Sequence, residues 1–330
     1  MQLVFYKCVV VLILFNGVSY LSASDGDRSP FYQKCVKNCV KSDCTEDEKQ
    51  FTPTAEKKLK TTNPLFMWNC LAECRYNCMW RTVEGFQQRG YDVPKFHGKW
   101  PFKRIYGVQE PGSAFASFLN LAAHVFMHVE FTRKFSIDDD DPRVFFWHFF
   151  AAVCMNAWIW SLIFHTRDSP FTEFMDYGCA LSMVMIMYIA AVIRVFSKRS
   201  KLTTSIVVLS ALVYAQHLFY LYSARVDYHY NMMVNLFFGV CGSLIWLWWG
   251  AGQWLSGRRY AWRLLAFVLL SAVALSLELL DFPPYYHIWD AHALWHLATV
   301  PLPLLFYRFV IDDLQYTRRS QGPKEDLKLT

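Results

Sequence analysis

The chain has 330 residues, of which 54% are hydrophobic and 18% are charged. This balance excludes an ordinary soluble domain and indicates a polytopic membrane protein. The formal net charge is +6, but no Lys/Arg-rich patch interleaved with aromatic residues is present. We therefore expect membrane lipid and no nucleic acid among its partners.

The first residues have the pattern of a secretory signal. Lys7 lies beside an apolar run over residues 8–15, and small residues between 19 and 24 offer cleavage sites. This pattern predicts a signal peptide over residues 1–23, with an uncleaved signal anchor as the alternative. Both readings place the polar segment 24–112 in the lumen of the secretory compartments.

Segment 24–112 contains two clusters of three cysteines, which are Cys35, Cys39, Cys44 and Cys70, Cys74, Cys78. An even number of cysteines in a small translocated domain predicts three disulfides. Steps of four residues place cysteines of each cluster on one face of a helix. Two antiparallel helices then allow the ladder Cys35–Cys78, Cys39–Cys74, Cys44–Cys70, although six cysteines permit other pairings. Zinc binding is the alternative, disfavoured because no Cys-x-x-Cys spacing occurs.

Residues 95–113 connect this domain to the first apolar run. Trp100, Phe102 and Tyr106 alternate with lysines and arginines, which is typical of a bilayer interface. The segment is interpreted as a linker along the membrane surface, or as a contact to a phosphate-bearing lipid headgroup.

Seven apolar stretches are long enough to span a membrane, at about 113–131, 144–165, 172–195, 203–222, 231–249, 262–280 and 289–310. The loops after spans one, three and five contain most of the positive charges, such as Arg133, Lys198 and Arg258. The opposite loops contain only Arg167 and Arg225. The positive-inside rule therefore predicts a luminal amino terminus, a seven-helix domain over 113–310 and a cytosolic tail over 311–330.

Five polar residues of the spans are predicted to lie at the luminal side, namely Ser161, His165, Asp176, His292 and His296. Ionisable residues at membrane depth are costly and usually serve a site. Three histidine nitrogens can bind Zn²⁺ and leave a fourth position for water, as in catalytic zinc sites. Asp176 is then a candidate to orient or deprotonate that water, and Ser161 to donate to an oxyanion. The set suits hydrolysis of an ester or an amide.

A lone His-x3-His pair in an apolar helix more often indicates packing than metal binding. His124 and His128 have the same spacing in the first span, but they run toward the opposite side and are interpreted as structural. Glu278, Asp281 and Asp290 are luminal carboxylates that could brace a ligand histidine.

The order Ser161-x3-His165, Asp176 and a late His292-x3-His296 in seven spans resembles the CREST superfamily of membrane hydrolases. The resemblance implies that the three histidines bind zinc and that Asp176 and Ser161 are catalytic.

The amino-terminal half, with "NCLAECRYNCMW", "FHGKWPF" and "GVQEPGS", resembles the Per-like family. That resemblance implies lipid remodelling of GPI-anchored proteins at the Golgi membrane, by phospholipase A2-type hydrolysis of the sn-2 acyl ester on the luminal side. Two alternatives stay open: a receptor or lipid-presenting factor with a structural zinc, and a ceramidase-like amidase. No obligate protein partner is inferred.

Overall fold

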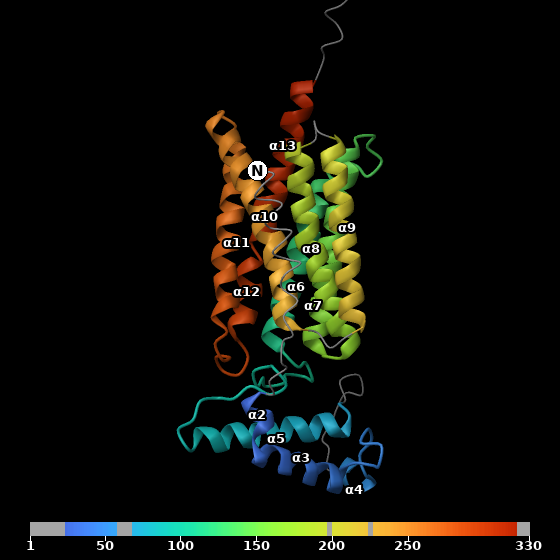
Figure 1. Cartoon of the computed structure of the whole chain (residues 1–330), viewed down its shortest axis with the longest axis vertical. Coiled ribbons are helices and arrows are strands. Elements are labelled where there is room, and N and C mark those ends of the chain that lie inside the picture. The colour runs from blue at the N-terminus through green and yellow to red at the C-terminus, as the bar shows by residue number, and fades with distance from the viewer. Residues whose placement is uncertain (1–23, 58–67, 197–199, 224–226, 322–330) are drawn as a thin grey trace, which may run out of the picture. The chain divides into compact units, whose positions relative to one another are not determined.

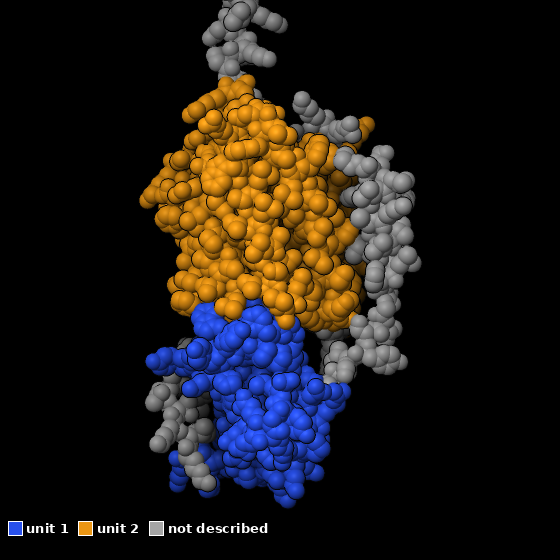
Figure 2. Space-filling view, turned by 90° about the vertical axis from the view of Figure 1, so that its left-hand side faces the viewer, with its two compact units in different colours: residues 1–112, 165–167, 281–291 blue, residues 113–164, 168–280, 292–330 orange. Residues whose placement is uncertain are grey.

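The computed structural model describes residues 24–57, 68–196, 200–223 and 227–321. These residues form helices and a few isolated bridges, and no strand occurs among them, so the all-α prediction is confirmed. The predicted signal peptide, 1–23, lies outside the described residues. The chain divides into unit 1 (residues 1–112, 165–167 and 281–291) and unit 2 (residues 113–164, 168–280 and 292–330), coloured separately in Figure 2.

Unit 1 contains the helices α2 (Asp25–Arg28), α3 (Pro30–Asp43), α4 (Pro53–Glu56) and α5 (Cys70–Gln87). Local sequence sets where the two longer helices begin. Pro30 occupies the first turn of α3, where its missing N–H is not needed. The Asn69 side chain caps α5 by accepting the Ala72 N–H at 2.8 Å.

Helices α3 and α5 lie side by side (Figure 1) and are joined by three disulfides. The bonds are Cys35–Cys78, Cys39–Cys74 and Cys44–Cys70, so the predicted ladder is confirmed. They close segments of 43, 35 and 26 residues. On the chain-entropy model, loops of this length stabilise the folded domain by about 3–4 kcal/mol each.

The segment predicted to lie at the bilayer interface is largely engaged within unit 1. Lys95 pairs with Asp281 at 2.5 Å and the Trp100 indole donates to the same carboxylate at 3.0 Å. Phe102 is buried, whereas Tyr106 is 92% exposed at the tip of a tight turn. A position at the bilayer interface therefore stays a prediction for Tyr106. It has less support for Lys95, Trp100 and Phe102, which contact other residues of unit 1.

Within the described ranges, seven helical segments are long and apolar enough to cross a membrane, as predicted. They are α6 (Pro111–Thr132), α7 (Pro142–Thr166), α8 (Pro170–Phe196), α9 (Ser200–Ser223), α10 (Tyr228–Leu255), α11 (Trp262–Leu280) after the short η2 (Arg259–Ala261), and the pair α12 (Ala291–Thr299) and α13 (Leu302–Gln321). Helix α8 packs against α9 and α10, and the main core gathers around Trp246 and Phe306. Large apolar side chains such as Phe219 and Trp248 point outward, as in lipid-facing helices.

The seventh span differs from its prediction in two respects. It is interrupted at Val300 and Pro301, because proline cannot continue the hydrogen bonding of α12. It also runs past residue 310, where the cytosolic tail was predicted to begin. The buried Asp313 makes this possible, since its carboxylate accepts bonds from Arg194 at 2.7 and 2.9 Å and from the Tyr260 hydroxyl at 2.8 Å.

Candidate metal centre

Three histidines on two of the spanning segments form a group that could hold a metal ion. His165 lies on the last turn of α7, and His292 and His296 lie one turn apart at the start of α12. Each offers one ligand atom, and these atoms lie within 4.8 Å of one another. The structure thus brings the three predicted ligands together, while metal binding itself stays a prediction.

A second group with suitable spacing consists of Cys44, Cys70 and Cys74 in unit 1. All three sulfur atoms are already used in disulfides. The thiolates that a metal requires are therefore lacking, and this group is not a metal site.

The Nδ1 atom of His165 is held by a buried carboxylate. It donates to Glu110 Oε2 at 2.7 Å, and Lys99 donates to Oε1 of the same carboxylate at 2.8 Å. Burial raises the pKa of Glu110, but the Lys99 ammonium and the His165 ring outweigh burial and place that pKa well below its usual range. An ionised carboxylate only accepts hydrogen bonds, so the His165 proton resides on Nδ1.

The Nδ1 atom of His292 is held in the same way by a carboxylate from another part of the chain. Glu278, near the end of α11, accepts from His292 Nδ1 at 2.7 Å. The Tyr228 hydroxyl donates to the other oxygen of Glu278 at 2.7 Å. Glu278 was one of three carboxylates expected to brace a histidine, and its bond to His292 has the expected form.

Hydroxyl groups take the place of the carboxylate at His296. The Ser117 hydroxyl lies 3.0 Å from His296 Nδ1 and 3.0 Å from the Ser161 hydroxyl, and it donates to the Ser113 carbonyl at 2.8 Å. When the single Ser117 proton is directed to the Ser113 carbonyl, the Ser117 oxygen accepts from both His296 Nδ1 and Ser161. In that arrangement His296 carries its proton on Nδ1.

The carboxylate contacts fix one tautomer for His165 and His292, and the hydroxyl contact of His296 is compatible with the same tautomer. A proton on Nδ1 leaves the lone pair of Nε2 as the metal-binding atom in His165, His292 and His296. Pairing of ligand histidines with carboxylates is the usual outer shell of a catalytic zinc site, and it fixes the ring orientation. Three neutral imidazoles fit Zn²⁺, and the donor set also suits other late transition metals.

Residues 61–314 match the Per1-like family. The chain belongs to the Per1-like family. It is 42% identical to "Post-GPI attachment to proteins factor 3" of Drosophila melanogaster, over 91% of this chain and 92% of that protein. It is 40% and 38% identical to proteins named "GPI-specific phospholipase A2-like PGAP3" of Danio rerio and Homo sapiens. These matches cover 92% and 95% of this chain and 94% and 97% of the relatives. No solved structure matches the chain.

The remaining predicted residues of this Per1-like chain occupy different places. Asp176 is buried in the second turn of α8, and it is not a member of the group of ligand atoms. Ser161 is linked to His296 through Ser117. Asp281 pairs with Lys95, so this carboxylate does not serve as the brace that was considered for it. The catalytic roles of Asp176 and Ser161 stay predictions.

The histidines of the first span have partners of another kind. His124 Nδ1 lies 3.3 Å from the Tyr307 hydroxyl. His148 Nε2 donates to the Phe135 carbonyl at 3.2 Å, so its Nδ1 accepts from His128 Nε2 at 2.9 Å. These bonds agree with the prediction that His124 and His128 are structural.

Sequence reasoning missed two residues of the site, Glu110 and Ser117. Glu110 directly precedes the proline that begins α6, and Ser117 lies two turns into that helix. The sequence signal of both residues is weak. Glu110 precedes the predicted span and resembles a solvated charge, and a small polar residue such as Ser117 is common in an apolar helix without a site.

Proposed function

We propose that this Per1-like chain is a membrane-embedded, zinc-dependent acyl-ester hydrolase that removes the sn-2 acyl chain of GPI-anchored proteins. One observation carries the proposal: three histidines converge with their ligand atoms within 4.8 Å of one another, and carboxylates hold the Nδ1 protons of two of them. The names of the relatives, which describe GPI-specific phospholipase A2-like proteins, agree with this chemistry.

The residues of the site divide into ligands, braces and a candidate base. A bound zinc would lower the pKa of a water and polarise the ester carbonyl. Glu110, Glu278 and Ser117 keep the rings in one orientation. Asp176 is the candidate to take the proton from the attacking water. Ser161 donates to Ser117 in this arrangement, which favours a positioning role over direct donation to an oxyanion.

The proposed orientation places the histidines at the luminal ends of the spans. The distribution of Lys and Arg over the loops supports it. The sn-2 ester of a phospholipid lies just below the headgroup, which is the depth of the last turn of α7 and the first turn of α12. Residence in the Golgi membrane, with a cytosolic carboxyl terminus, follows from the family resemblance and belongs to the proposal.

The proposal is tested with the full chain purified in detergent and a GPI-anchored protein carrying a diacyl lipid. We expect equal amounts of lyso product and free fatty acid by mass spectrometry, with zinc detected by elemental analysis. Zinc retained without a lyso product would favour a receptor or lipid-presenting factor. Fatty acid released from ceramide but not from the ester would favour an amidase.

A further inference from the structure

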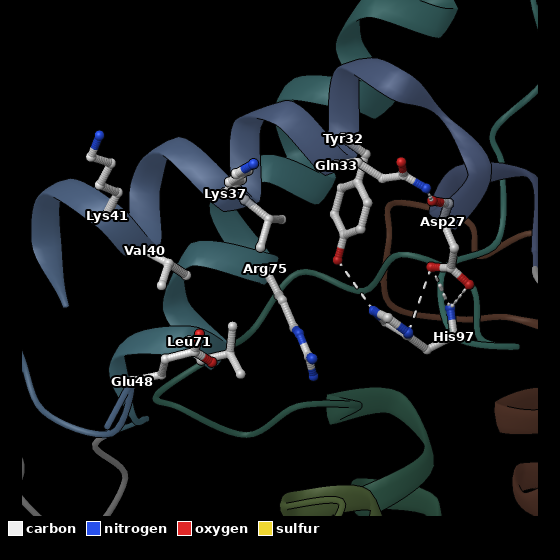
Figure 3. A pocket seen from close by; sticks show the side chains of 11 residues that line it. Asp27, Tyr32, Gln33, Lys37, Val40, Lys41, Glu48, Leu71, Arg75 and His97 are labelled. Carbon is white, nitrogen blue, oxygen red and sulfur yellow. Dashed lines mark hydrogen bonds and ion pairs between the residues drawn. The ribbon is translucent and has the colours of Figure 1, made fainter. Parts of the chain in front are cut away.

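Unit 1 contains a groove of about 620 Å³ that the metal centre does not use. It is lined by α3, α5 and the turn that contains His97 (Figure 3). Val36, Val40 and Leu71 give it an apolar floor, and the ring of Tyr32 lies at one end. The groove is thus large enough for several ring-sized groups of a ligand.

One cation extends into this groove. Figure 3 shows the Arg75 side chain reaching from α5 toward the side where Tyr32 and His97 lie. Among the residues that the structure describes, none forms a hydrogen bond or ion pair with Arg75. Lys37 and Lys41 add two further positive charges on the α3 side, against the carboxylates of Asp27 and Glu48. A planar guanidinium in such a position is suited to bind phosphate.

A hydrogen-bonded pair, Tyr32 and His97, accompanies Arg75. The Tyr32 hydroxyl lies 3.2 Å from His97 Nε2. Burial raises the pKa of Tyr32 to about 12, against the opposing Arg75 charge, so the hydroxyl keeps its proton near neutral pH. Burial lowers the pKa of His97, against the opposing charge of Asp27, and Arg75 adds to the lowering. Because the neutral pair uses one proton in its mutual bond, it offers an incoming anion at most one O–H or N–H beside the Arg75 guanidinium.

The backbone around His97 is held in a strained conformation. Its φ is 52°, followed by 83° at Gly98, in a tight turn closed by Phe96 and Lys99. Both carboxylate oxygens of Asp27 accept the His97 N–H, at 3.0 and 2.9 Å. A positive φ at a residue other than glycine is uncommon and concentrates at ligand-binding positions. These bonds hold Asp27 in place but leave its negative charge, so the groove has the positive charges of Arg75, Lys37 and Lys41 against the negative charges of Asp27 and Glu48.

We propose that this groove binds the phosphate-bearing glycan of the GPI anchor, with Arg75, Tyr32 and His97 around a phosphate and the apolar floor against sugar rings. The inference rests on the proposed function, because that function makes a GPI anchor the substrate. Such an anchor carries phosphodiester groups on a glycan that is covalently joined to the lipid. The groove would then select GPI-linked lipids over ordinary phospholipids.

Binding is measured by calorimetry on the full chain in detergent, with the delipidated glycan of a GPI anchor as the probe. Arg75→Gln should weaken binding by about tenfold or more, the loss expected for one charged hydrogen bond. Arg81→Gln is the matched control, since Arg81 is exposed on the same helix and outside the groove, and it should bind like the wild type. Equal affinity of Arg75→Gln and wild type would overturn the proposal. The proposal would also be overturned if the wild type bound the dephosphorylated glycan, or inorganic phosphate alone, as tightly as it binds the phosphate-bearing glycan.

Rates of hydrolysis of two substrates distinguish failure of the groove proposal from failure of the proposed hydrolase function. For an intact GPI-anchored protein, Arg75→Gln should raise KM about tenfold with kcat unchanged. For diacyl phosphatidylinositol without a glycan, the variant should equal the wild type. An equal loss on both substrates would contradict selection by the groove. If the wild type hydrolyses neither, the proposed function fails, and the binding experiment still decides whether the groove holds the glycan.

Discussion

Two pairs of histidines with identical spacing lie in different spans of this protein, and their partners differ in kind. His292 donates its Nδ1 proton to the Glu278 carboxylate, and His296 Nδ1 lies 3.0 Å from the Ser117 hydroxyl. His128 instead donates to the ring of His148, and His124 lies against the Tyr307 hydroxyl. The first arrangement presents lone pairs toward a common point, whereas the second uses ring nitrogens to join helices. The spacing of histidines is therefore less informative than the acceptors behind them.

The largest difference is expected on replacing one histidine from each pair. His292→Gln should abolish zinc binding and lower the rate of lyso-product formation by about 1,000-fold, since a catalytic metal contributes several kcal/mol. His124→Gln should retain zinc and change the rate little. Elemental analysis and mass spectrometry of the products measure both. Loss of zinc in His124→Gln, with the chain still folded by size-exclusion chromatography, would remove the distinction between the pairs.

Replacing the carboxylates tests whether the braces matter. Glu110→Gln should weaken zinc binding by about 10–100-fold, because the brace loses its charge and Lys99 its partner. Glu278→Gln should have a smaller effect, since the His292 side chain is 31% exposed and water can replace its partner. Competition with a fluorescent chelator gives both affinities. Unchanged affinity in the two variants would show that the carboxylates do not tune the ligands.

Ser161→Ala distinguishes positioning from direct catalysis. A positioning hydroxyl that donates to Ser117 should be worth about 1 kcal/mol, so the rate should fall about fivefold with zinc retained. A hydroxyl that stabilises an oxyanion would cost about 100- to 1,000-fold. Ser205→Ala, in α9, is a control for loss of a serine hydroxyl elsewhere in the bundle.

The smallest effect is expected from removing one tyrosine hydroxyl near the histidines of the first span and one near the candidate metal centre. Tyr307→Phe should leave zinc and rate unchanged and destabilise the bundle by about 1 kcal/mol, because His124 loses a hydrogen bond. Tyr228→Phe removes the same group behind Glu278 and should lower zinc affinity slightly instead. Thermal unfolding and the chelator assay compare the two. A loss of zinc in Tyr307→Phe would mean that the first-span histidines communicate with the metal centre.

Much of the fold was predictable because its determinants are local. Cysteines at i and i+4 in two helices allow a nested ladder, and continuous apolar runs locate spans. The course of the seventh span was not predictable in the same way. Asp313 lowers the hydropathy beyond residue 310, and its bonds to Arg194 and Tyr260, far away in sequence, hold that helix together with the buried side chains of Ile311 and Leu314.

The three histidines of the candidate site could be predicted from the sequence, whereas the residues that hydrogen-bond to them were harder to predict. His165, His292 and His296 could be grouped because the direction of each span fixes their depth. Glu110 could not be recognised while residues 95–113 were treated as a linker, since a single glutamate there resembles a solvated charge. Ser117 is a small polar residue in an apolar helix, which is common without a site. Its role follows only from the positions of Ser113, Ser161 and His296.

The wide separation in sequence of the ligands and their braces has a consequence for biogenesis. His165 lies at the midpoint of the 330-residue chain, whereas His292 and His296 belong to the seventh candidate span. If the three histidines bind a metal as proposed, all three rings are present only when translation of that span is complete. A truncated chain, even one that inserts six helices correctly, would lack two of the proposed ligands, so metallation would wait for synthesis of the seventh span.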